Sequence, residues 1–276
     1  MKTIKLKKVE HNVKVGKDCP YYEPNVTEDC MLELDGGVVG FYIKDVSKYS
    51  NKLSQLISIS NKEFRSGNVP KQEMSRGPQG TKADKLKRQI EGEILVTQFS
   101  TILGSVPPAP HMRRPYPTIS SVHREKKART FIKAMIGCAL ESEKIIKELA
   151  PNIYDRQAEL FKDVDDKWKF GNLFTSSISN YNISAAYHLD RANIVGSVNV
   201  ILTKRFKSKG GCLNVPDFAA TFEQGDNSML VYPAWKNMHG VTPIIPEQEN
   251  GYRNSLIFYP LKSFYHGQNR TKKNTD

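Results

Sequence analysis

Hydrophobic side chains recur at helical spacing in one long segment of the chain. Across residues 124–149, Phe131, Met135 and Cys138 fall three to four positions apart, and the other side of the segment is rich in Lys and Glu. An apolar stripe with this period is typical of an amphipathic helix. We therefore predict a helix over 124–149 that packs on a sheet, and a shorter helix over 153–161.

Strand-like segments occupy much of the remaining chain. Residues 35–45, which begin with a glycine turn, and residues 93–103 both predict strands. Residues 107–117 contain five prolines, which exclude a helix there. After Leu173 the texture changes to short apolar segments separated by Gly, Pro, Asn and Asp, which is typical of a β-sandwich or barrel. These segments are 182–190, 196–205, 211–217, 220–226, 227–235, 240–245 and 253–261.

This pattern divides the chain into two regions that we expect to share one core. Residues 1–170 form a mixed α/β support region, and residues 171–264 form a β-rich region, so the predicted fold class is α+β. A basic, breaker-rich loop over 65–88 interrupts the first region. The tail over 265–276 is polar and basic, and we expect it to be disordered.

Charge and cysteine content indicate the kind of partner and the cellular compartment. The chain has 276 residues and a formal net charge of +12, from 41 Lys and Arg against 29 Asp and Glu. Such a balance favours a polyanionic partner such as nucleic acid. The sequence has neither a membrane-spanning run nor a secretory h-region, so we expect a soluble, intracellular protein of the cytoplasm, nucleoid or nucleus. Four cysteines without CxxC spacing fit a reducing compartment, although a pair between Cys19 and Cys30 stays open.

Candidate metal ligands occur in the β-rich region. His188 and Asp190 form an H-x-D pair in a strand-like segment, where alternate side chains share a face. His239 follows later, directly before a glycine. Two imidazoles and one carboxylate suit a non-haem Fe(II) site, because three coordination positions stay open. The alternative is that the pairing is accidental and each histidine is an ordinary structural residue.

A late arginine strengthens the metal hypothesis. Arg253 opens an otherwise apolar strand. Burying a guanidinium is costly unless a carboxylate meets it, and its planar fork matches a carboxylate in a bidentate manner. That carboxylate belongs either to a ligand or to a nearby glutamate in a structural salt bridge.

The order H-x-D, His-Gly and Arg-x-Ser resembles the double-stranded β-helix of the Fe(II)/2-oxoglutarate-dependent dioxygenases. Residues 210–244, GGCLNVPDFAATFEQGDNSMLVYPAWKNMHGVTPI, resemble the TET/JBP nucleobase-oxygenase branch more narrowly, as does the stretch HLDRANIVGSVNV. The likeness covers about 173–262. It implies a jelly-roll, cupin-like catalytic core over 171–264, supported by helices from the N-terminal half.

The resemblance also implies roles for individual residues. His188, Asp190 and His239 are the implied catalytic iron ligands, and Arg253 with Ser255 holds the carboxylate of the cosubstrate 2-oxoglutarate. Asn193 matches a position at which some relatives touch the target base. An amide both donates and accepts, so it suits the O4 of thymine or the N4 amine of a cytosine. A turn-forming asparagine is the alternative.

The implied activity is an iron-dependent hydroxylation of the methyl group of a 5-methylpyrimidine in DNA, using O2 and a ferryl intermediate. We expect 5-methylcytosine first and thymine second, with the base flipped out of double-stranded DNA. The basic loop would contact phosphates, or it is simply a solvated face; its candidate residues are Lys82, Lys85, Lys87 and Arg88. The alternatives are a 2-oxoglutarate oxygenase acting on protein or RNA, and a catalytically silent DNA-binding module.

Overall fold

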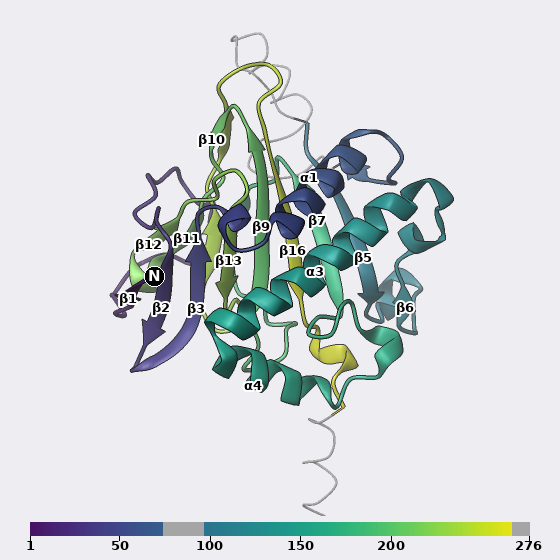
Figure 1. Ribbon diagram of the computed structural model, residues 1–276, viewed down its shortest axis with the longest axis horizontal. Coiled ribbons are helices and arrows are strands. Elements are labelled where there is room, and N and C mark those ends of the chain that lie inside the picture. Colours follow the sequence, from purple (N-terminus) through teal and green to yellow (C-terminus); the bar gives the residue numbers. More distant parts are fainter. Residues whose placement is uncertain (74–96, 267–276) are drawn as a thin grey trace, which may run out of the picture.

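A computed structural model describes residues 1–73 and 97–266 and has a mixed α+β fold (Figure 1). In these residues, most strands belong to a large sheet and a smaller one. The large sheet has the order β1 (Lys2–Lys5), β2 (Cys30–Leu34), β3 (Gly37–Ile43), β13 (Met229–Tyr232), β9 (Asn199–Phe206), β16 (Tyr252–Tyr259), β7 (Ser176–Tyr181), β5 (Phe99–Val106) and β4 (Gln72–Glu73), with β6 (Thr118–Ile119) paired to β5. The small sheet has the order β12 (Ala220–Phe222), β11 (Leu213–Val215), β14 (His239–Val241) and β8 (Ala185–His188).

The chain crosses repeatedly between the two sheets. After β7 in the large sheet it forms β8 in the small one, β9 in the large one and β11 with β12 in the small one. It then returns to β13, crosses to β14 and ends in β16. A separate two-stranded sheet joins β10 (Ser208–Gly210) to β15 (Ile244–Pro246).

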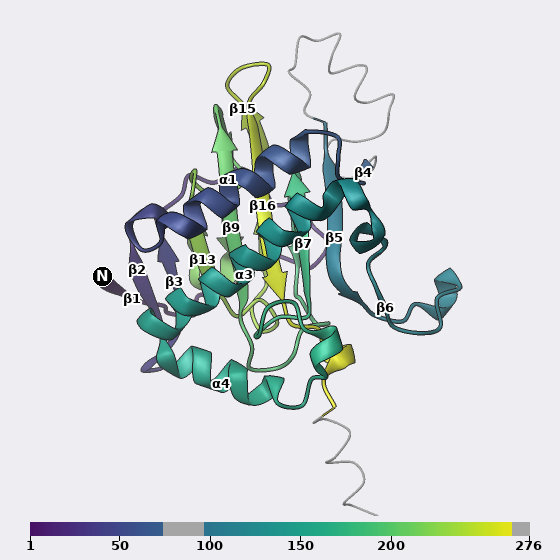
Figure 2. The same cartoon turned by 45° about the vertical axis from the view of Figure 1, so that its right-hand side comes forward.

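Three α-helices cover the face of the large sheet that lies away from the small sheet (Figures 1 and 2). They are α1 (Asn51–Arg65), α3 (Arg129–Leu149) and α4 (Pro151–Phe161). The described residues also contain short 3-10 helices at Val46–Lys48, Pro110–Met112, Ser121–Arg124, Lys126–Ala128, Asp166–Trp168, Pro216–Phe218 and Lys262–Phe264. The N-cap of α1 is Ser50, whose hydroxyl accepts the backbone N–H of Leu53 at 3.1 Å. Such a cap satisfies one of the free donors at a helix start.

Each face of the large sheet has its own core. Alternate residues of a strand point to opposite faces, and in β9 Leu202 faces the helices whereas Ile201 faces the small sheet. The helix-side core joins both halves of the chain, with members such as Phe41, Phe131 and Phe258. The other core packs the large sheet against the small one.

Several predictions from the sequence are confirmed. The fold class is α+β, and the predicted helices correspond to α3 and α4. Residues 35–45 contain β3, and 93–103 overlaps β5 from Phe99 onward. The proline-rich segment 107–117 has no α-helix, only the 3-10 turn at Pro110–Met112.

Other features differ or lie outside the description. Helix α1 was not predicted. The Cys19–Cys30 pair does not form, since both thiols are free and buried. The rest of the predicted basic loop from residue 74, with Lys82, Lys85, Lys87 and Arg88, and the tail from residue 267 lie outside the described residues. Within the described ranges, no helix is both long and apolar enough to cross a bilayer.

A glycine permits the close approach of β3 to β13. A Cβ on Gly40 would overlap the backbone oxygen of Val231, whereas on Gly37 its nearest neighbour is 3.8 Å away. We expect Gly40→Ala to lower the free energy of unfolding by about 1–3 kcal/mol through overpacking. Gly37→Ala, in the same strand, should have less effect. Urea unfolding of the two variants measures this, and equal losses of stability would contradict it.

Candidate functional site

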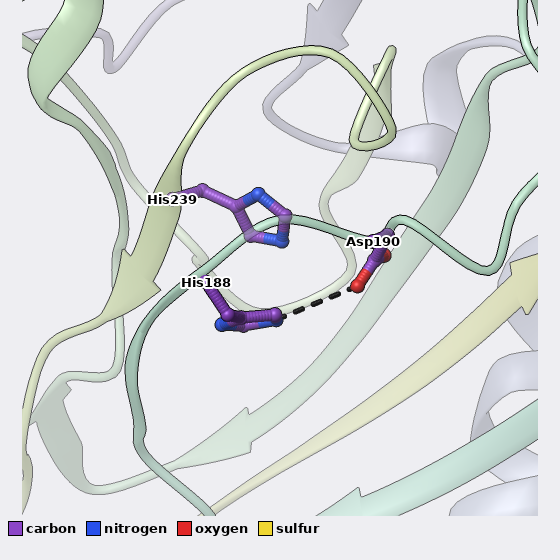
Figure 3. A group of neighbouring side chains, drawn as sticks. All are labelled: His188, Asp190 and His239. Atoms are coloured by element: carbon purple, nitrogen blue, oxygen red, sulfur yellow. Dashed lines mark ion pairs between the residues drawn. The ribbon is translucent and has the colours of Figure 1, made fainter. Parts of the chain in front are cut away.

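Two histidines lie side by side on adjacent strands of the small sheet. Strand β8 pairs with β14 so that His188 and His239 are register partners, and directly opposite side chains project to the same face. Their ring centroids lie 4.4 Å apart. Asp190 follows the end of β8, and its Oδ1 lies 3.5 Å from His188 Nε2. Ligand atoms of these three side chains lie within 4.8 Å of one another (Figure 3), so one metal ion can touch all three.

Backbone carbonyls set the orientation of both imidazoles. His188 Nδ1 lies 2.8 Å from the oxygen of Ala186, and His239 Nδ1 lies 3.0 Å from the oxygen of Asn237. A carbonyl only accepts, so each Nδ1 carries a proton, and in the neutral imidazole Nε2 is then the atom with the lone pair that a metal needs. Burial and the neighbouring His188 lower the pKa of His239, which favours its neutral, metal-binding form.

Two asparagines hold the carboxylate. Asn199 Nδ2 donates to Asp190 Oδ2 at 2.8 Å, and Asn193 Nδ2 donates to Asn199 Oδ1 at 2.8 Å and to Asp190 Oδ2 at 3.5 Å. An ionised carboxylate only accepts, so Asn199 must turn its NH2 group toward Asp190, and its oxygen then requires the NH2 group of Asn193. This relay leaves Asp190 Oδ1 beside His188 and leaves the side-chain oxygen of Asn193 to accept.

The three side chains open into a cavity of about 330 Å³ between the two sheets. Its wall is largely apolar and includes Ile178, Ile201, Leu213, Val241 and Ile257. The structure brings six of the residues singled out from the sequence to this one cavity: His188, Asp190, His239, Arg253, Ser255 and Asn193. The Oγ of Ser255 donates to the backbone oxygen of Asn180 at 3.4 Å.

Arg253 is buried in the cavity wall without a counterion. It is 3% exposed, and no carboxylate of the described residues forms an ion pair with it, so the alternative of a salt bridge to a nearby glutamate is not found there. Its Nε has no hydrogen-bond partner among the residues that the structure describes. Burial and the charge of Arg205 lower the pKa of Arg253 to about 9. A buried guanidinium in this state costs free energy until an anion meets it.

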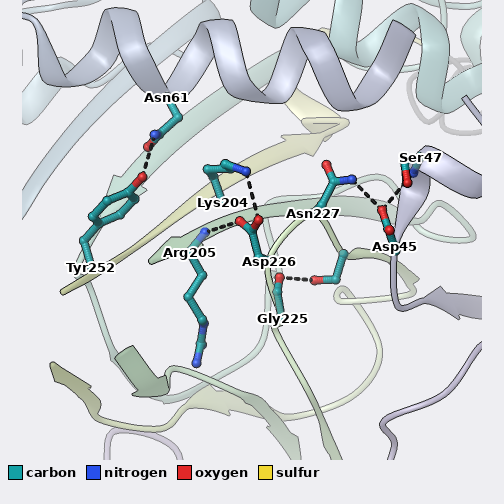
Figure 4. A network of polar contacts seen from close by, with 10 residues as sticks. Asp45, Ser47, Asn61, Lys204, Arg205, Gly225, Asp226, Asn227 and Tyr252 are labelled. Atoms are coloured by element: carbon teal, nitrogen blue, oxygen red, sulfur yellow. Dashed lines mark hydrogen bonds and ion pairs between the residues drawn. The ribbon is translucent and has the colours of Figure 1, made fainter. Parts of the chain in front are cut away.

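Arg205 adds to the positive charge. It is the register partner of Arg253 on the neighbouring strand β9. Its guanidinium donates to the carbonyl oxygens of Ser208, at 3.0 Å, and Gly210. Only its backbone N–H binds Asp226, at 2.8 Å, and in Figure 4 the guanidinium points away from that carboxylate. The pair therefore places two guanidinium groups close together, and the carboxylates of Glu223 and Asp226 partly offset the charge of Arg205.

A glycine makes room for Arg253. Gly211 has a left-handed backbone with φ of 61°, and a Cβ there would lie 2.6 Å from Arg253 Cδ. The double glycine at 210–211, which a simple hairpin turn would explain from sequence alone, thus also lets the backbone pack on the arginine side chain.

Sequence reasoning missed Asn199 and Arg205. The signal for Asn199 was present, since an asparagine inside the apolar run VNVIL must find a polar partner when it is buried. Its partner is set by the fold, and so is the pairing of Arg205 with Arg253.

Comparisons with known proteins bear on the fold. No family model matches the sequence, and no curated protein matches it. The solved structure of NgTET1 in complex with 5mC DNA is similar, with a TM-score of 0.56 at 13% identity over 95% of this chain and 90% of that one. An oxidoreductase of the 2OG-Fe(II) oxygenase family from Burkholderia pseudomallei has a TM-score of 0.47 at 12% identity, covering 80% of this chain and 84% of its own. OsALKBH1 has a TM-score of 0.39 at 12% identity, covering 87% and 99%. The first comparison shows a shared fold, and the resemblance predicted from the sequence is confirmed at that level.

The amide relay predicts a measurable effect on metal affinity. Asn199→Ala removes the donor that fixes Asp190, and we expect the affinity for Co(II), followed by its visible absorption, to fall about 10- to 100-fold. Asn254→Ala is the control, because Asn254 is also fully buried but bonds to Ser179 and Asn61 on the helix side of the sheet. Equal losses of affinity in both variants would show that the relay does not position the ligand.

Proposed function

We propose that this chain is an Fe(II)- and 2-oxoglutarate-dependent dioxygenase with a double-stranded β-helix core over residues 171–264. One observation carries the proposal: two imidazoles and one carboxylate share a single cavity with a buried arginine that has no counterion in residues 1–73 and 97–266. The alternation of β7–β9, β11–β14 and β16 between two sheets supports the jelly-roll winding.

The three ligand residues fit a ferrous ion. Both histidines use Nδ1 for a backbone carbonyl and keep Nε2 for a metal, and the relay from Asn199 directs one carboxylate oxygen toward His188. Nitrogen and oxygen donors of this kind, with open positions beside them, suit Fe(II). When bound, iron would supply the activation of O2 that is coupled to oxidative decarboxylation of 2-oxoglutarate to succinate and CO2.

Arg253 and Ser255 are the residues that would bind the cosubstrate. The guanidinium supplies a two-pronged set of donors for a carboxylate, and the hydroxyl of Ser255 lines the same cavity on the same strand. The carboxylate would relieve the cost of burying Arg253 beside Arg205. The apolar wall excludes water and strengthens this interaction.

For the substrate we propose a 5-methylpyrimidine in double-stranded DNA, with 5-methylcytosine ahead of thymine. The net charge of +12 and the bound 5mC DNA of the similar NgTET1 structure support DNA. Both N–H groups of the Asn193 amide are committed within the relay, so contact with the flipped base would use its side-chain oxygen. That acceptor matches the N4 amine of cytosine and not the O4 of thymine. Lys82, Lys85, Lys87 and Arg88 are proposed phosphate contacts.

A direct assay tests the proposed function. The chain is incubated with Fe(II), 2-oxoglutarate and duplex DNA that carries or lacks 5-methylcytosine, and digested nucleosides are analysed by mass spectrometry. We expect 5-hydroxymethylcytosine together with DNA-dependent succinate. His188→Ala and His239→Ala should abolish both products and leave DNA binding largely intact. Succinate released only with protein or RNA supports the oxygenase with another substrate, and failure to bind iron supports a silent DNA-binding module.

A variant at Arg253 distinguishes a role in cosubstrate binding from a role in folding. We expect Arg253→Met to raise the half-saturating 2-oxoglutarate concentration about 100-fold or more, because the cosubstrate carboxylate would have no buried cation to pair with. The same variant should keep or raise the melting temperature of the cosubstrate-free chain, since it removes an unpaired buried charge. Steady-state kinetics and thermal melts measure the two effects. A lower melting temperature with unchanged kinetics would assign Arg253 a structural role.

A further inference from the structure

The cavity-lining face of the large sheet continues beyond the cavity. In the pairing of β7 with β5, Asn180 lies opposite Ser100 and Ile178 lies opposite Ile102. Asn180 and Ile178 line the cavity, and directly opposite residues project to the same side of a sheet. Ser100 and Ile102 therefore stand on the cavity side, one strand away from the cavity wall.

The small sheet does not cover this extension. Its order ends at β8, and Ile102 is 43% exposed although it lies in the interior of a strand. Beyond β5, Gln72 of β4 pairs with Ser100 and continues the same face. Strands β4, β5 and β6 lie together at one side of the molecule in Figure 2, next to β7.

This surface forms a groove of about 580 Å³, here called the β5 groove, defined by Gln72, Ser100, Ile102, Arg114, Thr118 and Arg124. No Asp or Glu of the described residues lines it. Arg124 is exposed and forms no ion pair within the described chain. Arg114 uses Nε to bind the oxygen of Pro107 at 3.1 Å, which leaves its terminal N–H groups for a ligand.

We propose that the β5 groove binds the sugar-phosphate backbone beside the base that enters the cavity. Guanidinium and hydroxyl groups are the side chains that most often contact phosphate oxygens. Ile102 supplies an apolar contact for a sugar. The groove has no lining carboxylate among the described residues, so it does not repel phosphates. It also lies one strand from the cavity, so a DNA strand bound in it would hold a neighbouring base close to that cavity. This inference rests on the proposed function and adds the path of the strand to it.

Matched pairs of variants test the groove. Ile102→Glu places a negative charge in the groove without changing the core. Its control is Ile59→Glu, which places the same charge on α1, outside the groove, at a side chain that is 41% exposed. Arg124→Gln removes a groove cation, and Lys133→Gln removes an exposed cation from α3. Binding to a fluorescent duplex with 5-methylcytosine is followed by anisotropy, without iron or 2-oxoglutarate, so that no turnover occurs.

We expect Ile102→Glu and Arg124→Gln to weaken DNA binding about three- to tenfold and to reduce the slope of log K against log salt by about 1 for each phosphate that is no longer neutralised. Their two controls should bind like the unmodified chain. Equal effects in groove and control variants, or no DNA binding by the unmodified chain, overturn the inference. Co(II) binding, measured separately without DNA, should be unchanged in all four variants. Failure of the oxygenase proposal therefore appears as missing 5-hydroxymethylcytosine and succinate when the unmodified chain is given iron, 2-oxoglutarate and methylated duplex, and failure of the groove appears as unaltered DNA affinity.

Discussion

The pairing of β8 with β14 is the constraint on which the site depends. It makes His188 and His239 register partners, and a slip by one residue would turn one imidazole to the other face of the sheet. Glycine at position 240 leaves room for the side chains that pack on this strand pair, since a Cβ there would lie 2.8 Å from Cys19 Cβ and 3.1 Å from the Tyr187 ring. The N-terminal segment can therefore pack closely over the strand pair, and the backbones of Gly16 and Lys17 hydrogen-bond to Tyr187.

The pair of neighbouring arginines beside the cavity lowers the stability of the folded chain. Arg205 and Arg253 bring two like charges together inside the protein. Arg205 binds two carbonyl oxygens and lies near the carboxylates of Glu223 and Asp226, whereas no carboxylate of the described residues forms an ion pair with Arg253. Packing alone would favour an apolar residue at Arg253. The close approach of Gly211 to the arginine shows that the surrounding backbone is shaped for it. Under the proposed function, the cosubstrate carboxylate would pair with Arg253, and its binding would then stabilise this end of the cavity.

Local patterns predicted much of the fold and the centre of the site. The helix over 124–149 and the late strands carry strong periodicity, and the H-x-D pair, His239 and Arg253 are chemically conspicuous in apolar surroundings. Helix α1 has apolar residues at Leu53, Ile57 and Phe64, but polar residues dominate between them, and only packing against α3 makes the stripe clear. Asn199 and Arg205 acquire their roles from partners on other elements, which no local pattern can supply.

The two ends of the large sheet differ on the face that lines the cavity. The small sheet covers the β2–β3 end and leaves Ile102 of β5 exposed at the other end. At the β1–β3 end the inner face carries Leu32 and Tyr42, which pack against Phe222 in a closed apolar cluster. At the other end the inner face carries Ser100 and the exposed Ile102, bordered by arginines. Because helices occupy the opposite face, a long polyanion that follows the sheet toward the cavity finds polar, cationic surface at the β5 end and closed hydrocarbon at the other. Under the proposed function, this difference between the two ends would set the direction from which DNA approaches the cavity.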